Sequence, residues 1–230
     1  MGTNTDTSMA TRTLMKCTNS RIDLTLDYHA HVLPGCDHGS DSVETSRKQL
    51  AMAAAARVRT VCATPHFYPH RESIPSFLQR REASARLLRE NLTADAPQLQ
   101  LGAEVLICDG MERLDGLPRL CRGETNELLL EMPFYQWPET IWDTLYALCE
   151  RRDIEIVLAH AERYSPEAIE QLIRDNVALQ LNSECLTRPL HRKRYLTWIK
   201  NGSVKYLGSD IHMLGNGYRA WEICRNLLRE

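Results

Sequence analysis

Several features that would assign this chain to a familiar class are missing from it. None of its apolar runs approaches the ~18 residues that a membrane-spanning helix needs, so we expect no membrane insertion. Its eight cysteines are scattered and form no C-x-x-C pair, which argues against a disulfide framework or a zinc ribbon and is typical of a reducing cytoplasm. An excess of charge is also missing, because 28 Lys and Arg face 30 Asp and Glu. We therefore expect a cytoplasmic protein without a nucleic-acid partner.

The length and the amino-terminal segment predict the domain organisation. The chain has 230 residues, of which 43% are hydrophobic and 25% charged, and this composition supplies enough apolar mass for one sizeable core. Residues 1–21 are rich in Thr and Ser and hold no hydrophobic block, so they predict a flexible tail rather than a secretory signal. Since α/β barrels reach this length undivided, we expect a single domain over residues 22–230.

Strand and helix signals alternate along that domain. Seven short apolar segments predict strands: the first opens on the alternation of Ile22, Leu24 and Leu26, and the others cover residues 59–64, 99–107, 126–132, 154–159, 177–182 and 204–208. Helical patterns follow over residues 40–57, about 76–92, 139–152 and 166–174, then in a basic segment that ends at 201–202 and in a last one from about 219. This alternation favours a parallel β/α architecture, either a barrel or an open sheet.

The segment D-Y-H-A-H-V-L-P-G-C-D-H-G, at residues 27–39, concentrates metal-ligating residue types. Side chains two apart in a strand share a face, so Asp27, His29 and His31 are expected together. Two imidazoles at that spacing can reach one metal ion, and His38 follows in a turn. A lone buried histidine is more often a hydrogen-bonded core residue, but a cluster of histidines and carboxylates indicates a site.

Further candidate ligands lie where predicted strands end. His66 follows the second strand, Glu104 lies in or at the end of the third, and His160 follows the fifth, while Asp210 and His212 follow the seventh. Barrel enzymes build their sites at that edge from several strands. This donor set exceeds what one ion can use, so we expect two or three metal ions with a carboxylate such as Glu104 bridging them. Nitrogen and oxygen ligands without thiolate suit manganese, iron or zinc.

Such a cluster predicts phosphoryl-transfer chemistry. In sites of this kind a metal-bound hydroxide is the nucleophile, and metals ~3.5–4 Å apart hold the attacking and leaving oxygens. Arg163, three residues after His160, is a candidate for binding a phosphate bidentately. A surface ion pair between Arg163 and either Glu162 or Glu167 is an equally weighted alternative.

The candidate residues lie in motifs with a recognisable order. H-x-H, T-P-H, G-A-E, L-A-H-A-E-R-Y and S-D-x-H follow one another between residues 23 and 217, and this order resembles the polymerase and histidinol phosphatase (PHP) superfamily. Within it, D-x-H-x-H-x-L-P-G-x-D-x-G-S and A-H-x-E-R-Y are similar to the CpsB/CapC branch. Members of that branch are manganese-dependent bacterial tyrosine-protein phosphatases of capsule and exopolysaccharide operons.

The resemblance implies a fold, a metal centre and a substrate. The fold would be a distorted seven-stranded (β/α) barrel of the TIM-like PHP type, and the cofactor would be manganese. The substrate would be a phosphotyrosine protein, namely a membrane-associated tyrosine autokinase. Carried over by position, the resemblance assigns one ion to His29, His31, Glu104 and Asp210, a second to Glu104 and His160, and a third to His38, His66 and His212.

Two positions depart from the pattern of the branch. The branch usually reads Asp-Asp-Gly where this chain has Asp37-His38-Gly39; imidazole still ligates, so metal binding survives while the metal preference shifts. The branch commonly carries an Arg five residues after the last His, where this chain has Gly217. Arg219 is the nearest basic candidate for holding the phosphate.

The sequence leaves three functions open. The favoured one is a protein-tyrosine phosphatase that acts through metal-bound hydroxide. A small-molecule phosphatase of the histidinol-phosphate type would need the same metals but a narrower pocket, and a non-catalytic regulatory module would keep the metals and bind a kinase. A nuclease of the superfamily is disfavoured by the charge balance. A thiolate mechanism is disfavoured too, because no cysteine is followed by Arg at the spacing of a C-x5-R loop.

Overall fold

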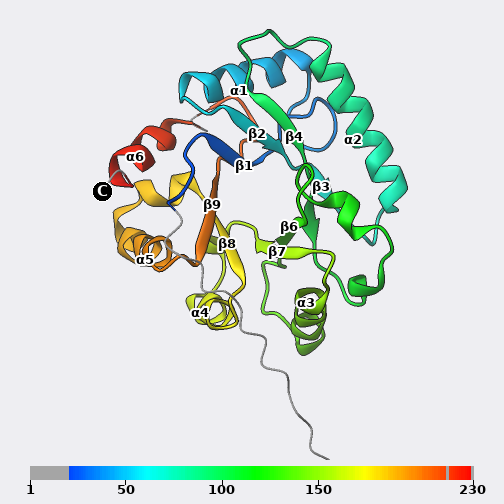
Figure 1. The fold of residues 1–230 in the computed structure, drawn as a ribbon, viewed down its shortest axis with the longest axis vertical. Helices are drawn as coiled ribbons and strands as arrows, with labels where there is room; N and C mark the ends of the chain where they lie inside the picture. Colours follow the sequence, from blue (N-terminus) through cyan, green and yellow to red (C-terminus); the bar gives the residue numbers. More distant parts are fainter. Residues whose placement is uncertain (1–20, 216–217, 229–230) are drawn as a thin grey trace, which may run out of the picture.

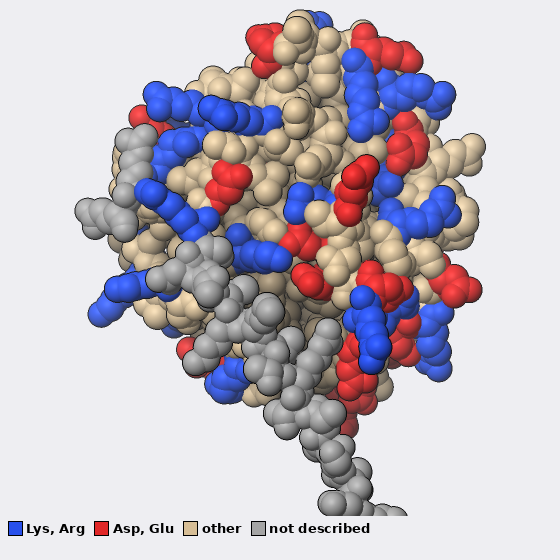
Figure 2. Space-filling view, in the orientation of Figure 1, with Lys and Arg blue, Asp and Glu red and all other residues tan. Residues whose placement is uncertain are grey.

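The computed structural model describes residues 21–215 and 218–228, in which parallel strands form a ring with helices around it (Figure 1). Charges of both signs share the face seen in this orientation (Figure 2). The strands and α-helices are, in chain order, β1 (Leu26–Ala30), α1 (Val43–Ala55), β2 (Thr60–Ala63), β3 (His66–Phe67), α2 (Ile74–Arg89), β4 (Gln98–Leu101), β5 (Glu104–Leu106), β6 (Glu127–Glu131), α3 (Glu139–Glu150), β7 (Glu155–Leu158), α4 (Pro166–Arg174), β8 (Ala178–Asn182), α5 (Pro189–Lys200), β9 (Val204–Gly208) and α6 (Arg219–Leu227).

The ring has seven strand positions because two of its strands are interrupted. A two-residue break at 64–65 separates β2 from β3, and another at 102–103 separates β4 from β5. The strands therefore pair in two groups, ordered β1-β2-β4 and β3-β5-β6-β7-β8-β9, with every pair parallel. The predicted seven-stranded (β/α) barrel is confirmed, and the interrupted strands are its distortion.

The ring closes between β9 and β1 at the carboxyl ends of the strands. The backbone N–H of Asp210 donates to the carbonyl of His29 at 2.8 Å, and that of His31 donates to the carbonyl of Ile211 at 3.0 Å. These bonds join the two segments that carry most of the predicted ligands. Closing the barrel therefore also brings the first and last parts of the site together.

The first strand begins later than predicted and is irregular. It starts at Leu26, and its register against β2 shifts between Asp27 and Ala30. The Asp27 carboxylate accepts hydrogen bonds from the Ser209 backbone at 2.8 Å and from the Tyr218 hydroxyl at 2.5 Å. The expectation that Asp27 joins the two histidine side chains is therefore wrong, because the shifted register turns it toward the helix side of the barrel.

The α-helices, β2 and β6 to β9 agree with the predictions to within three residues at each predicted end. The strand predicted over residues 99–107 is divided into β4 and β5, and β3 lies outside the predicted strands. α1 is capped by Ser42, whose side chain accepts from the Thr45 backbone at 3.2 Å. Pro166 opens α4 as predicted. Within the described ranges no helix is both long and apolar enough to cross a membrane.

An aromatic stack and an ion-pair network close the barrel interior near the amino ends of the strands. The rings of Tyr28 and Tyr206 stack with centroids 3.9 Å apart. Glu127 is 5% exposed, and its carboxylate lies 2.7 Å from Arg122 Nη2, 2.6 Å from Lys205 Nζ and 2.5 Å from the Tyr206 hydroxyl. Burial opposes ionisation of Glu127, but its hydrogen bonds to Lys205, Tyr206 and Arg122 hold the pKa of this carboxyl below its ordinary value.

We predict that Glu127→Ala lowers the free energy of unfolding by about 2–4 kcal/mol, because it leaves two largely buried cations without their partner. Since the folded pKa of Glu127 is lowered, its contribution is present at neutral pH and is lost as the pH falls through that pKa. Urea unfolding of both proteins at pH 7 and in acid should show the difference shrinking. The control is Glu155→Ala, whose side chain is 62% exposed and 3.8 Å from Lys205. Equal urea midpoints for Glu127→Ala and the wild type would contradict the prediction.

Candidate metal centre

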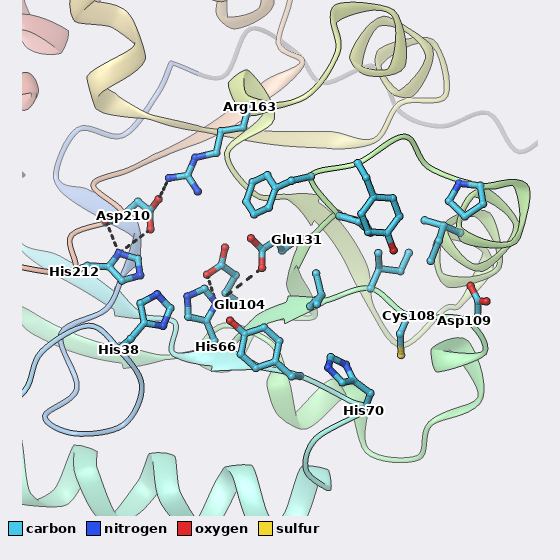
Figure 3. A pocket seen from close by; sticks show the side chains of 18 residues that line it. His38, His66, His70, Glu104, Cys108, Asp109, Glu131, Arg163, Asp210 and His212 are labelled. Carbon is cyan, nitrogen blue, oxygen red and sulfur yellow. Dashed lines mark hydrogen bonds and ion pairs between the residues drawn. The ribbon is translucent and has the colours of Figure 1, made fainter.

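Glu104, the first residue of β5, is the carboxylate around which the predicted ligands gather (Figure 3). Its Oε2 lies 3.3 Å from His29 Nε2, 3.2 Å from His31 Nε2 and 2.9 Å from His66 Nδ1. Its Oε1 lies 2.8 Å from His160 Nε2. All five side chains are buried. One carboxylate thus contacts four imidazoles that come from three different parts of the ring, as a bridging ligand would.

Asp210 and two more histidines extend this cluster. Asp210 Oδ1 lies 3.5 Å from the Nε2 atoms of both His29 and His31. The His212 ring stacks on the His31 ring with centroids 3.9 Å apart, and the centroid of the His38 ring lies 4.7 Å from that of His212. The structure therefore brings together all eight residues that the sequence predicted as metal ligands: His29, His31, His38, His66, Glu104, His160, Asp210 and His212.

The donor atoms form three groups, each compact enough to hold one ion. Within a group the atoms lie no more than 4.8 Å apart, and the groups are His31, His66 and His212; His29, His31 and Asp210; and His66, Glu104 and Glu131. Because the groups share His31 and His66, they form one adjoining centre. The assignment of His38 and His160 to particular ions stays a prediction.

Glu131, the last residue of β6, belongs to this cluster and was missed at the level of sequence. Its carboxylate oxygens lie 3.5 Å from His160 Nε2 and 4.0 Å from His66 Nδ1. The signal that could have found it is the alternation of Glu127, Leu129 and Glu131, which places all three on one face of a strand. A glutamate at a strand end is ordinarily solvated, so the alternation becomes informative only once that face is known to be the barrel interior.

Asp37 orients one side of the cluster. The Nδ1 of His31 lies 2.7 Å from Asp37 Oδ2, and the same carboxylate accepts from the backbone N–H groups of His66 at 3.0 Å and Gly39 at 2.9 Å. Burial opposes ionisation of Asp37, but the hydrogen bond and charge of His31 hold the pKa of Asp37 well below its usual value. Such outer contacts fix the orientation and tautomer of a ligating histidine.

Gln180 and Asn182, at the carboxyl end of β8, orient the other side. Gln180 Oε1 accepts from the His160 backbone at 2.7 Å and lies 3.2 Å from His29 Nδ1. The Gln180 amide donates to Asn182 Oδ1 at 3.0 Å, and Asn182 Nδ2 donates to Asp210 Oδ2 at 2.9 Å. One chain of side-chain amides therefore connects three predicted ligands.

Two predicted ligands have a strained backbone. Four of the described non-glycine residues have positive φ, and they include His160 at 30° and Asp210 at 50°. A residue in such a conformation costs about 1–3 kcal/mol and persists only where its surroundings over-determine it. Both residues lie just beyond a strand end, where the hydrogen bonds to Gln180 and His29 hold the backbone. The strain is thus concentrated where ligand direction matters.

The arrangement of the rings fits metal ions. The Nδ1 atoms of His29 and His31 face the oxygen acceptors of Gln180 and Asp37, which leaves the Nε2 atoms directed inward. Those two Nε2 atoms lie 3.1 Å apart and 3.3 and 3.2 Å from Glu104 Oε2. Two imidazole nitrogens and a carboxylate oxygen this close together can share one metal ion.

Unpartnered atoms support the same conclusion. Both ring nitrogens of His66 and the Oε2 of Glu104 are buried without a hydrogen-bond partner, which ordinarily costs about 1–3 kcal/mol for each group. Burial favours neutral His160, but the carboxylates of Glu104 and Glu131 raise its pKa to about 9. The same carboxylates that attract a proton here would attract a metal ion, and the nitrogen and oxygen donors suit manganese, iron or zinc.

The two predicted arginines differ in their location. Arg163 Nη2 pairs with Asp210 Oδ2 beside the cluster, and this contact replaces the surface ion pair with Glu162 or Glu167 that the sequence left open. Figure 3 shows the guanidinium reaching Asp210. Arg163 therefore lines the cavity beside the predicted ligands.

Arg219 is not brought to the metal centre. It is the first residue of α6 and lines a separate cavity with Arg57 and Arg225, whereas the cavity over the cluster is lined by Arg163. Gly217, the position where the branch carries Arg, lies outside the described residues. The predicted role of Arg219 in holding phosphate is not supported by this placement.

The described cysteines are poorly suited to nucleophilic attack. Burial raises the pKa of the Cys36 and Cys149 thiols to about 11 and that of Cys121 and Cys224 to about 12. Cys108 lines the cavity over the cluster, and burial raises its pKa as well. The thiolate that a cysteine-dependent phosphatase needs is therefore scarce at neutral pH.

A parallel seven-stranded β/α barrel defines a fold of the PHP type, and the histidines and carboxylates gathered at its strand ends could hold metal ions. The chain belongs to the CpsB/CapC family of capsular polysaccharide synthesis, whose family model matches residues 25–229. The resemblance predicted from the motifs is thereby confirmed.

Relatives with assigned names lie within this family. The chain is 26% identical over 201 residues to tyrosine-protein phosphatase YwqE of Bacillus subtilis, covering 81% of this chain and 77% of the relative. It is 25% identical over 209 residues to tyrosine-protein phosphatase CpsB of Streptococcus pneumoniae, covering 82% of this chain and 83% of the relative. A solved structure from work on YwqE and CpsB, described as unique metal-dependent tyrosine phosphatases, has the same fold, with a TM-score of 0.69, 22% identity and coverage of 87% of this chain and 86% of that chain.

We predict that the wild-type protein holds two to three manganese ions and that Gly208→Ala lowers its metal affinity at least about tenfold. A Cβ at Gly208 would lie 2.5 Å from His29 Cβ and 2.7 Å from Gln180 Nε2, so it would displace a ligand and its orienting amide. Elemental analysis after loading and dialysis measures the metal content. The control is Gly215→Ala, where no atom lies within 4 Å. Finding at most one ion in the wild type would refute a multinuclear centre, and wild-type metal content in Gly208→Ala would refute the positioning by Gly208.

Proposed function

We propose that this protein is a metal-dependent protein-tyrosine phosphatase. The observation that carries the proposal is the buried cluster around Glu104, which offers more nitrogen and oxygen donors than one ion can use and adjoins the guanidinium of Arg163. The names of YwqE and CpsB, to which the chain is similar along most of its length, support tyrosine phosphate as the substrate class. The raised thiol pKa values disfavour the alternative of a cysteine nucleophile.

The residues of the site take separate roles in this proposal. The eight predicted ligands and Glu131 would hold the ions, which when bound would supply the Lewis acidity and the activated water that hydrolysis of a phosphate ester needs. Arg163 would bind the phosphoryl oxygens, because its planar guanidinium can donate two parallel hydrogen bonds. Tyr164 would position His160: its hydroxyl lies 3.2 Å from His160 Nδ1 and is held by the backbone of Met132 at 3.0 and 3.2 Å.

The cavity supports a protein substrate over a small phosphate ester. It has a volume of about 880 Å³ and extends from the predicted metal ligands to a rim where Phe134 and Tyr135 are 70% and 67% exposed. A side chain presented by another protein can enter such an open cavity. We further propose manganese as the metal and a bacterial tyrosine autokinase of capsule or exopolysaccharide synthesis as the substrate, both of which the resemblance of the motifs implies. The family description supports only the link to capsular polysaccharide synthesis.

We predict that the metal-stripped protein hydrolyses phosphotyrosine only after manganese is added. His29→Ala, Glu104→Ala and Asp210→Ala should each lose most of the turnover, because each removes a predicted ligand. Phosphate release from phosphotyrosine, phosphoserine and histidinol phosphate, with and without manganese, measures this and separates the candidate functions. Faster turnover of histidinol phosphate would favour the small-molecule enzyme, and no turnover of any ester would favour the regulatory module. Inactivation by iodoacetamide at unchanged metal content would contradict a metal mechanism.

We also predict that His38 is a working ligand. His38→Asp should stay active and shift the preference toward manganese, because a hard oxygen ligand suits manganese better than zinc. His38→Ala should lose metal and activity together. Activity and metal content of both variants, each loaded separately with manganese and with zinc, measure the shift. Full activity and full metal content in His38→Ala would show that this position is not a ligand.

A further inference from the structure

Phe134 and Tyr135 are among the large apolar side chains most exposed to water in the described part of the chain, and the metal centre does not account for them. They follow Pro133 after β6 and line the same cavity as the cluster. Exposed aromatic rings at the mouth of a site are typical of binding surfaces, since such rings supply a large contact area at low conformational cost. The position of Phe134 and Tyr135 therefore indicates a ligand that has an apolar part.

The loop that carries these rings is fixed at its base. Trp137 Nε1 donates to the carbonyl of Pro133 at 2.9 Å, which closes the segment 133–137 on itself. The Trp137 indole also packs edge-on against Tyr164, with centroids 5.3 Å apart, and Tyr164 is itself bonded to the His160 ring. The exposure of Phe134 is thus held by contacts that lead back to a predicted metal ligand.

Phe134 continues the wall of the metal centre outward. Its ring lies 6.2 Å from the His160 ring at an angle of 21°. Tyr68, which lines the same cavity, lies beside His66, with ring centroids 5.4 Å apart and planes within 12°. Both imidazoles contact the Glu104 carboxylate. Phe134 and Tyr68 therefore each lie beside one of the histidines that contact Glu104.

The polarity of the cavity changes along its length. Figure 3 shows Glu104, Asp210 and His212 gathered at one end, with Arg163 above them. Beyond these polar groups the lining is mostly apolar, although His70 and Asp109 lie at the far end (Figure 3). Its aliphatic and proline side chains are Leu106, Ile107, Pro133, Pro138 and Ile141. A ligand that fits carries a compact anion at one end and a flat apolar group next to it.

We propose that Phe134, together with Tyr68, forms a slot for the aryl ring of phosphotyrosine and sets the preference of the enzyme for aryl over alkyl phosphates. The inference rests on the proposed function and deepens it. The buried floor and the exposed rim favour a phosphate carried on a long, rigid side chain, because tyrosine holds phosphorus farther from its backbone than serine does. A phosphoserine that reaches the metal ions leaves the slot unfilled and gains nothing from Phe134.

The test compares Phe134→Ala with the wild type, both loaded with manganese, on phosphotyrosine and phosphoserine. The ratio of kcat/KM for phosphotyrosine to that for phosphoserine should fall about three- to tenfold, as expected for loss of one aromatic contact. Comparing variant with wild type cancels the different leaving groups of the two esters. Phe134→Tyr should restore the ratio. Leu190→Ala, a control at a site 84% exposed and outside the cavity lining, should leave it unchanged.

A binding measurement gives the same comparison without turnover. Calorimetry of the manganese-loaded proteins with phenylphosphonate and methylphosphonate should show that Phe134→Ala loses affinity for the phenyl compound about three- to tenfold more than for the methyl compound. Equal losses for both compounds, or an unchanged substrate ratio, would overturn the slot while leaving the phosphatase intact. A wild type that does not hydrolyse phosphotyrosine would instead overturn the proposed function and the slot with it.

Discussion

The site depends on one electrostatic constraint: a buried carboxylate, Glu104, lies among four imidazoles whose ring nitrogens face it. The Nδ1 atoms of His29 and His31 contact Gln180 and Asp37, so their Nε2 atoms are the ones directed at the carboxylate. Buried negative charge of this kind is stabilised by positive charge among the inner atoms, which protons or metal ions can supply. The barrel supplies the frame, because parallel strands direct all of their carboxyl ends, and the residues that follow them, toward a single edge.

The rest of the structure serves to keep those side chains in place. Three features restrict the orientation of the predicted ligands. They are the strained backbone at His160 and Asp210, the close approach of Gly208 to His29, and the amide chain through Gln180. At the opposite end of the strands, the Glu127 network closes the interior with charges that satisfy one another. The amino ends of the strands thus stabilise the fold, and the carboxyl ends carry the donor atoms that could bind a metal.

Much of this was predictable from the sequence. Period-two patterns and strand ends located the strands and seven of the eight candidate ligands, with His38 in a following turn, because these features follow from local geometry. The choice of a barrel over an open sheet came from the resemblance of the motifs to the PHP superfamily. Three features were not predictable. The register shift in β1 that removes Asp27 depends on its partner strand, the inward direction of Glu131 depends on the curvature of the ring, and the distance of Arg219 from the site depends on how α6 packs. Each is set by contacts between distant segments, which a single sequence does not display.

The closure of the barrel between β9 and β1 has a consequence for biogenesis. His29 and His31 leave the ribosome among the first residues of the domain and Asp210 and His212 among the last, yet hydrogen bonds between these two segments complete the ring. The full set of predicted ligands therefore exists only after both segments have been made and have met. A metal ion held by both segments would tie the first strand to the last and add to the stability of the folded protein.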